Sequence, residues 1–188
     1  MRLVALTMLF TIGGIGAELS IGSKAPDFAV MTVEGMDVAS SSLRGARATV
    51  VGFVSAKCPV ANAYNQRMIA LYKEFSIQGV EFVLVNSNSN ETAAEMRIHA
   101  KQAALVFPVY RDAGNRVADV FGAQTTPEMF VLDGDGIVRY HGAIDDAQNE
   151  ARVKVPGLRL AIEAVLAGKP VEPARTKAFG CTLHRVRT

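Results

Sequence analysis

Cys58 stands at a position suited to thiol chemistry, in a chain of 188 residues that has only two cysteines. It follows the apolar run ATVVGFVS, residues 48–55, which predicts a buried strand. Pro59 comes next, and helical spacing of apolar residues begins there. Cys58 is therefore expected at a helix N-terminus, where backbone N–H groups and the neighbouring Lys57 favour the reactive thiolate. The alternative is a small buried hydrophobe, as most free cysteines are.

A second candidate for chemistry is the dipeptide Thr126-Pro127, directly before the apolar run EMFVLD. A proline before a strand suggests a cis peptide bond, which turns the chain tightly and leaves backbone groups free to face a neighbour. On the pattern alone a trans bond is the commoner state of an X–Pro bond.

The elements that must position these residues follow from periodicity and from turn signals. Residues 22–45 predict a loop and a small hairpin, and strands are expected at 48–55, 80–88, 107–112, 128–133 and 137–144. Helices are expected from Pro59 to Gly79, from the capping box Thr92–Glu95 for about twelve residues, at 115–123 and from Pro156 to Gly168.

This alternation predicts an α/β fold, a three-layer sandwich with parallel strands and an antiparallel hairpin at one edge. The hairpin is expected at Gly134-Asp135-Gly136. No repeat or linker divides the chain after residue 20, and 49% hydrophobic residues suffice for one core. We expect one domain over residues 18–188.

Charge excludes one class of partner. Twenty Lys and Arg against eighteen Asp and Glu give a net charge of +2, and no basic block is present. Nucleic acid is therefore not expected as a partner.

The first residues, MRLVALTMLFTIGGIGA, run from a charge through an apolar stretch to small residues, which is typical of a signal peptide over residues 1–17. The stretch is too short for a membrane span. We expect a secreted or periplasmic protein with no stable span after cleavage, in a compartment where two cysteines can pair. The alternative is an uncleaved anchoring terminus.

Several segments together resemble a known family. The order VVGFVSAKCP, a helix, then GAQTTPEMFVLDGDGIVRYHG resembles the thioredoxin fold, and GSKAPDF resembles the start of redoxins of the alkyl hydroperoxide reductase and thiol-specific antioxidant group. GAIDDA and the ending VLAGKPVEPARTKAFGCTLHR are similar to a bacterial peroxiredoxin-like subfamily with a C-terminal Gly-Cys motif. The resemblance implies a thioredoxin-like α/β/α sandwich with a mixed sheet and an N-terminal redoxin extension, and a cis bond at Pro127.

Carried over by position, Cys58 matches the first cysteine of the thioredoxin Cys-x-x-Cys, while Ala61 stands where the second would be. Ser55 replaces a cysteine found three positions earlier in many members of the subfamily. Peroxiredoxins have a Thr three residues before their peroxidatic cysteine, and Ser55 occupies that place before Cys58. The peroxidatic position itself would align nearer Ala61. The resemblance includes Cys181, which implies that it pairs with Cys58 and resolves intermediates. The alternative is a tail that never meets Cys58.

Other residues carry weaker signals. His184, with Cys58 and Cys181, would suit copper(I) or zinc, which makes a copper-handling or non-catalytic binding module a distant alternative. His99 and His141 are expected to be solvated or satisfied histidines. Asp133 and Asp135 predict a turn, and Asp145 and Asp146 a solvated or capping pair.

The expected function is thiol–disulfide exchange on a protein or small-molecule disulfide, with an unidentified thiol reductant and no cofactor or resident metal. Cys58 and Cys181 are the expected catalytic residues, and Thr126, Pro127 and Pro59 are expected to contact substrate. The first alternative is a peroxiredoxin-like thiol peroxidase acting on peroxide, with antioxidant function.

Overall fold

The computed structural model describes residues 19–186. The predicted signal peptide, residues 1–17, lies outside the described residues.

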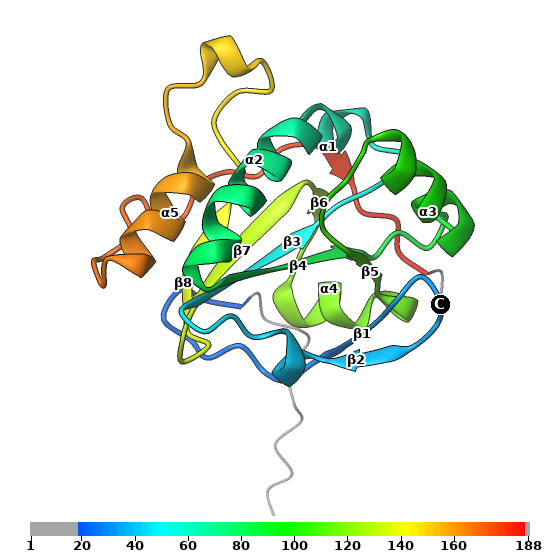
Figure 1. Cartoon of the computed structure of the whole chain (residues 1–188), viewed down its shortest axis with the longest axis horizontal. Helices are drawn as coiled ribbons and strands as arrows, with labels where there is room; N and C mark the ends of the chain where they lie inside the picture. The colour runs from blue at the N-terminus through cyan, green and yellow to red at the C-terminus, as the bar shows by residue number, and fades with distance from the viewer. Residues whose placement is uncertain (1–18, 187–188) are drawn as a thin grey trace, which may run out of the picture.

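A seven-stranded mixed sheet forms the centre of the structure, in the order β2-β1-β5-β4-β3-β7-β8 (Figure 1). The central strand β3 runs parallel to β4 and antiparallel to β7, and β7 and β8 form the predicted hairpin. The strands are β1 (Ala29–Met31), β2 (Asp37–Ala39), β3 (Ala48–Phe53), β4 (Val80–Asn86), β5 (Val109–Arg111), β7 (Glu128–Asp133) and β8 (Val138–Gly142).

Helices cover both faces of this sheet. They are α1 (Pro59–Ala63), α2 (Asn65–Phe75), α3 (Ala93–Gln102), α4 (Arg116–Phe121) and α5 (Gly157–Leu166), with short 3-10 turns at Ser40–Leu43, Ser76–Gln78, Ala113–Asn115 and Glu150–Arg152. Successive residues of β3 point to opposite faces. Val50 packs in a cluster with side chains of α2 and α5, whereas Val51 packs in a cluster with side chains of α4. The result is the expected α/β/α sandwich.

Local signals placed most elements correctly. The small hairpin expected within residues 22–45 is β1 and β2, paired from Ala29–Ala39 to Met31–Asp37. Thr92 and Glu95 form a capping box at the start of α3. The single helix expected after Pro59 is instead two helices, because the chain leaves helical hydrogen bonding at Tyr64.

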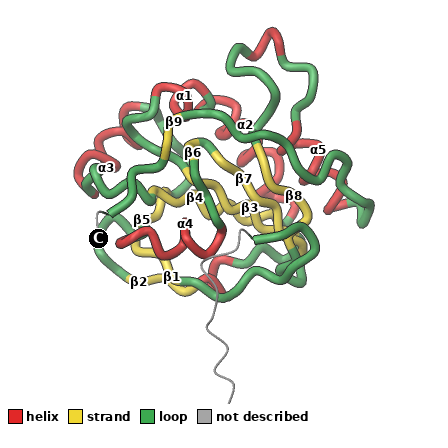
Figure 2. Tube along the Cα trace, turned by 180° about the vertical axis from the view of Figure 1, so that it is seen from behind, coloured by secondary structure: helices red, strands yellow, loops and turns green. Residues whose placement is uncertain are grey.

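A second, two-stranded sheet joins distant parts of the chain. Strand β6 (Thr125–Thr126) pairs antiparallel with β9 (Cys181–Thr182), so that Thr126 faces Cys181 and Thr125 faces Thr182. Figure 2 shows β9 beside β6, close to α1. The C-terminal segment therefore crosses the end of the fold where the predicted site lies.

No helix within residues 19–186 is long and apolar enough to cross a membrane.

Candidate active site

Cys58 is the N-cap residue of α1, as predicted. Its backbone is extended, with φ −81° and ψ 114°, and its Sγ accepts a hydrogen bond of 3.3 Å from the backbone N–H of Ala61. Pro59 fits the first helical position because its missing N–H needs no partner there. The sulfur is almost fully buried, with Cys58 3% exposed. Backbone dipoles thus surround a sulfur that can carry negative charge.

Cys58 and Cys181 form a disulfide, with Cα atoms 5.9 Å apart and a sequence separation of 123 residues. This confirms the predicted pairing. It also removes the alternative of a free tail, since Cys181 and Thr182 pair with β6. No cysteine among the described residues is free.

The peptide bond between Thr126 and Pro127 is cis, as the family resemblance implied. The carbonyl oxygen of Thr126 lies 3.3 Å from Cys58 Sγ. Thr126 is 1% exposed, and its hydroxyl oxygen has no hydrogen-bond partner among the described residues. Pro127 is buried beside it, whereas Pro59 is exposed on the rim. The structure therefore brings Cys58, Cys181, Thr126 and Pro127 together.

A buried carboxylate, Glu91, holds the loop that precedes Cys58. The Ser55 hydroxyl donates to Glu91 Oε1 and accepts hydrogen bonds from the backbone N–H groups of Lys57 (3.1 Å) and Cys58 (3.0 Å). Glu91 Oε2 accepts from the Ala56 N–H at 2.7 Å. Glu91 is 5% exposed and Ser55 6%. Ser55 thus orders the backbone at Cys58.

The same network continues to the C-terminal segment. Asn86 donates to Glu91 Oε2 at 2.8 Å, and its own Oδ1 accepts from the backbone N–H of Asn88. Asn88 Oδ1 accepts from the backbone N–H of His184 at 3.0 Å. Sequence reasoning missed Glu91, Asn86 and Asn88. The polar run NSNSNE directly after a buried strand was the available signal, because the carboxyl ends of the parallel strands β3 and β4 meet at one edge.

Lys57 contributes less positive charge to the cysteine than the sequence suggested. Its ammonium pairs with Glu95 Oε1 at 2.9 Å and donates to the carbonyl of Asn90 at 2.7 Å. Hydrogen bonds from Thr92 and Lys57 lower the pKa of Glu95 to about 2, so this carboxylate stays charged. Because Glu95 balances the charge of this ammonium, the N–H groups at the start of α1 are the main local groups that stabilise a thiolate.

A second buried carboxylate, Glu128, holds the loop before the cis proline. Its Oε2 accepts from the backbone N–H groups of Gln124 (2.8 Å) and Thr125 (2.9 Å), and its Oε1 lies 2.6 Å from His141 Nε2. Burial alone would raise the pKa of Glu128, but the hydrogen bonds from His141, Gln124 and Thr125 bring it below its ordinary value. His141 is buried, its Nε2 pairs with Glu128, and its ring stacks on that of Phe130. The role of Glu128 was not predicted.

Asp145 was expected to be solvated or to cap backbone, and the structure excludes the first. It is 5% exposed, accepts from the Tyr64 hydroxyl at 2.9 Å and from the Ala147 N–H at 3.2 Å, and pairs with Arg67. Burial, and next the hydrogen bond to Asp145, raise the pKa of Tyr64. Asp146 does cap backbone, since its Oδ1 accepts from the N–H groups of Lys154 and Val155. Asp145 thus ties α2 to the chain after β8.

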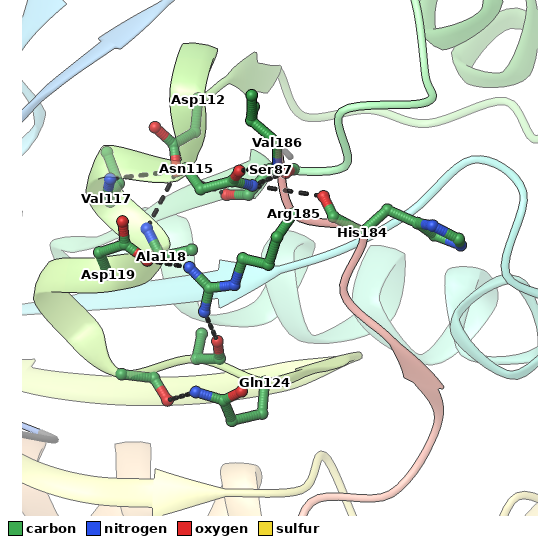
Figure 3. A network of polar contacts seen from close by, with 12 residues as sticks. Ser87, Asp112, Asn115, Val117, Ala118, Asp119, Gln124, His184, Arg185 and Val186 are labelled. Carbon is green, nitrogen blue, oxygen red and sulfur yellow. Dashed lines mark hydrogen bonds and ion pairs between the residues drawn. The ribbon is translucent and has the colours of Figure 1, made fainter. Parts of the chain in front are cut away.

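The predicted copper or zinc ligands do not converge. Cys58 and Cys181 are bonded to each other, and His184 is exposed, with its side chain directed away from the polar contacts around it (Figure 3). His99 is half-buried against Asn65. Within residues 19–186 there is no group of three or more His, Cys, Asp or Glu side chains that could hold a metal ion.

Comparison with known sequences gives a consistent result. Residues 21–141 match the AhpC/TSA family. The thiol-disulfide oxidoreductase ResA of Bacillus thuringiensis (strain Al Hakam) is 27% identical over 121 residues, which cover 64% of this chain and 68% of that protein. ResA of Bacillus subtilis (strain 168) is 29% identical over 121 residues, covering 64% and 66%.

Solved structures agree on the fold. An uncharacterized conserved protein from Geobacillus kaustophilus superposes with a TM-score of 0.83 at 27% identity, over 90% of this chain and 94% of that one. Peroxidoxin BcpB from Mycobacterium tuberculosis superposes with a TM-score of 0.64 at 20% identity, over 80% and 98%. The second likeness shows the fold alone.

Proposed function

Since the chain belongs to the AhpC/TSA family, we propose that it is a thiol–disulfide oxidoreductase in which Cys58 is the attacking residue and Cys181 the resolving residue. The observation that carries this proposal is the Cys58–Cys181 disulfide, with Cys58 at the start of α1 and in contact with the cis Thr126–Pro127 turn. The activity in the names of the ResA relatives supports it.

The exchange has two steps. In the reduced protein, the Cys58 thiolate attacks one sulfur of a substrate disulfide, so a Cys58–substrate bond forms and the other substrate sulfur leaves as a thiolate. The Cys181 thiolate then attacks Cys58 Sγ, the protein disulfide forms, and the second substrate sulfur leaves. Two electrons pass from the protein to the substrate. With an oxidised protein and a dithiol substrate, the same steps run in reverse.

The surrounding residues have separate roles in this scheme. The Ala61 N–H stabilises the departing or attacking Cys58 sulfur. Thr126 presents its carbonyl at the sulfur, and Pro127 holds that carbonyl in place through the cis bond. Pro59 lies exposed on the rim, where it contacts the substrate.

The activity can be tested in glutathione buffers of graded redox potential. Free thiols are alkylated at each potential and the intact mass is measured. The Cys58–Cys181 redox couple is supported if a form two hydrogens lighter appears at one potential and takes up no alkylating agent. This form should be missing in Cys181→Ser. Two alkylated thiols at every potential, or a Cys58 that reacts with glutathione disulfide no faster than free cysteine, would overturn it.

A thiol peroxidase would use the same two cysteines. Peroxide oxidises the first thiolate to a sulfenic acid, and a second thiol then condenses with this sulfenic acid to give a disulfide. The site offers Ser55 rather than the Thr of the peroxidase pattern. We expect the reduced protein to consume hydrogen peroxide no faster than a free thiol. Rapid consumption, lost in Cys58→Ser, would favour the peroxidase instead.

The proposed site of action is an oxidising compartment outside the cytoplasm. The N-terminal sequence and the disulfide support this location, since such bonds persist in oxidising surroundings. Periplasmic or medium fractions from cells that express the full chain should contain a product shortened near residue 17. Retention of the full-length chain in the cytoplasm would contradict the location without affecting the chemistry.

A further inference from the structure

Segment Phe179–Leu183 binds the site in an extended conformation through main-chain pairing. Its strand β9 pairs with β6, the short strand that ends at the cis proline, and the Leu183 N–H donates to the Gln124 carbonyl at 2.9 Å. Within residues 19–186, β6 pairs only with β9. Such pairing provides affinity through backbone groups, which any extended chain can supply.

The positions along this segment differ in how much room they leave for a side chain and in how deeply that side chain is buried. A Cβ at Gly180 would lie 2.0 Å from the Thr126 carbonyl oxygen, so only glycine fits before the cysteine. Thr182 is exposed, whereas Leu183 is 3% exposed and belongs to the buried cluster that includes Phe121 and Ala123. The Phe179 ring lies 6.3 Å from the Tyr64 ring. The site therefore accepts the pattern Gly-Cys-x-Leu, with an aromatic residue before it.

We propose that this segment occupies the binding site of client polypeptides, and that a client binds by placing its own Gly-Cys-x-aliphatic sequence antiparallel to β6. The Cys58–Cys181 disulfide is then an internal copy of the mixed disulfide between Cys58 and a client cysteine. This inference rests on the proposed exchange activity of Cys58 and names the substrate class of that site.

The residues that follow the segment, 184–186, make polar contacts with the body of the protein (Figure 3). Arg185 pairs with Asp119, the Val186 N–H donates to Asn115 Oδ1 at 2.7 Å, and the Ser89 N–H donates to the His184 carbonyl at 3.0 Å. Exposed ion pairs of this kind add little to stability. Reduction of the disulfide therefore leaves the segment held by β pairing, by Leu183 and by the hydrogen bonds of the residues that follow it.

After reduction, the tethered segment competes with clients at an effective concentration on the order of millimolar. A client pairs with β6 by displacing the tethered segment. The segment pairs with β6 again when Cys181 resolves the mixed disulfide. In the oxidised protein the segment occupies the β6 edge, so a client should pair with β6 only after the Cys58–Cys181 bond is broken, and weakening the segment should speed that pairing.

The test uses the full chain with Cys181→Ser and a synthetic peptide of sequence AFGCTLHR, whose cysteine is joined to glutathione. Cys58 attacks the peptide sulfur, the Cys58–peptide bond forms and glutathione leaves as a thiolate. Attack on the other sulfur would give the glutathione adduct, which intact mass distinguishes. We expect the peptide adduct to form at least about tenfold faster than the adduct with the same peptide carrying Ala for Gly or Asp for Leu. Replacing the peptide Thr by Ala should leave the rate unchanged.

A second variant tests the competition. Adding Leu183→Ala to Cys181→Ser should raise the rate of peptide capture several-fold, while adding Ile77→Ala, a change at an exposed residue, should not. If all peptides react at one rate, while Cys58 still reacts rapidly with glutathione disulfide, the inference is overturned and the exchange activity stands. If Cys58 reacts rapidly with neither, the proposed function fails.

Discussion

Ser55 donates its hydroxyl hydrogen bond to Glu91, which lies 36 residues further along the chain, and accepts the backbone N–H of Cys58 in return. A buried carboxylate therefore acts on Cys58 through a serine and through the backbone. Glu91 also accepts from Ala56 and Asn86, so each of its oxygens has a donor.

Replacing Glu91 by Gln should disturb this arrangement, because an amide nitrogen would then face a donor. We expect the free energy of unfolding to fall by about 1–3 kcal/mol, the cost of an unsatisfied buried group. Urea unfolding measures it. Hydrogen exchange of the Lys57 and Cys58 amides should accelerate beyond the global change. Glu34→Gln, at an exposed residue, is the control; equal stability and protection in both variants would contradict this role of Glu91.

Replacing Gly180 by Ala should weaken the disulfide, since the added Cβ would meet the Thr126 carbonyl. We expect the Cys58–Cys181 bond to be reduced more easily, by at least about 30 mV in glutathione buffers. Gly134→Ala is the matched control, because a Cβ there would meet nothing closer than 3.6 Å. An unchanged potential for Gly180→Ala would show that β9 can shift without cost.

Reduction should lower stability by an amount that loop closure predicts. A bond that closes 123 residues restricts the unfolded chain by about 5 kcal/mol in the chain-entropy model. Urea unfolding of the oxidised protein and of the protein in excess dithiol measures the difference. The Cys58→Ser/Cys181→Ser variant should resemble the reduced protein. If the free energies of unfolding of the oxidised and reduced proteins differ by less than about 1 kcal/mol, strain that the disulfide imposes on the folded protein offsets its effect on the unfolded chain.

Glu128 predicts a loss of stability in acid. Its pKa in the folded protein lies below the ordinary 4.5, because the hydrogen bonds from His141, Gln124 and Thr125 outweigh the effect of burial. Its stabilising contribution is therefore present above pH 4.5 and is lost as the pH falls through the folded pKa. Glu128→Gln should flatten the pH dependence of unfolding in that range. Glu34→Gln should not, and a parallel slope for Glu128→Gln would contradict the assignment.

Local patterns predicted the place of Cys58 at a helix N-terminus, because the buried strand, the proline and the helical repeat that indicate it lie in neighbouring residues. The proline before a strand offered a cis bond at Pro127 only as the rarer state, and the family resemblance implied it. The pairing with Cys181 came from the family resemblance, because no short-range pattern encodes it. Glu91 and Glu128 escaped notice because their roles depend on which strand ends meet in space. The burial of Asp145 was missed for the same reason, because its partners Tyr64 and Arg67 lie some 80 residues away.

The distance along the chain between Cys58 and Cys181 has a consequence for cleavage. The bond makes a covalent ring of the chain from Cys58 to Cys181, and that ring includes the exposed loop 147–155 that projects beyond α5 (Figure 1). A protease that cuts this loop once opens the ring without separating the pieces. In oxidising surroundings the two pieces of a nicked molecule therefore stay covalently joined, with the mass of the intact chain plus one water, until a reductant separates them.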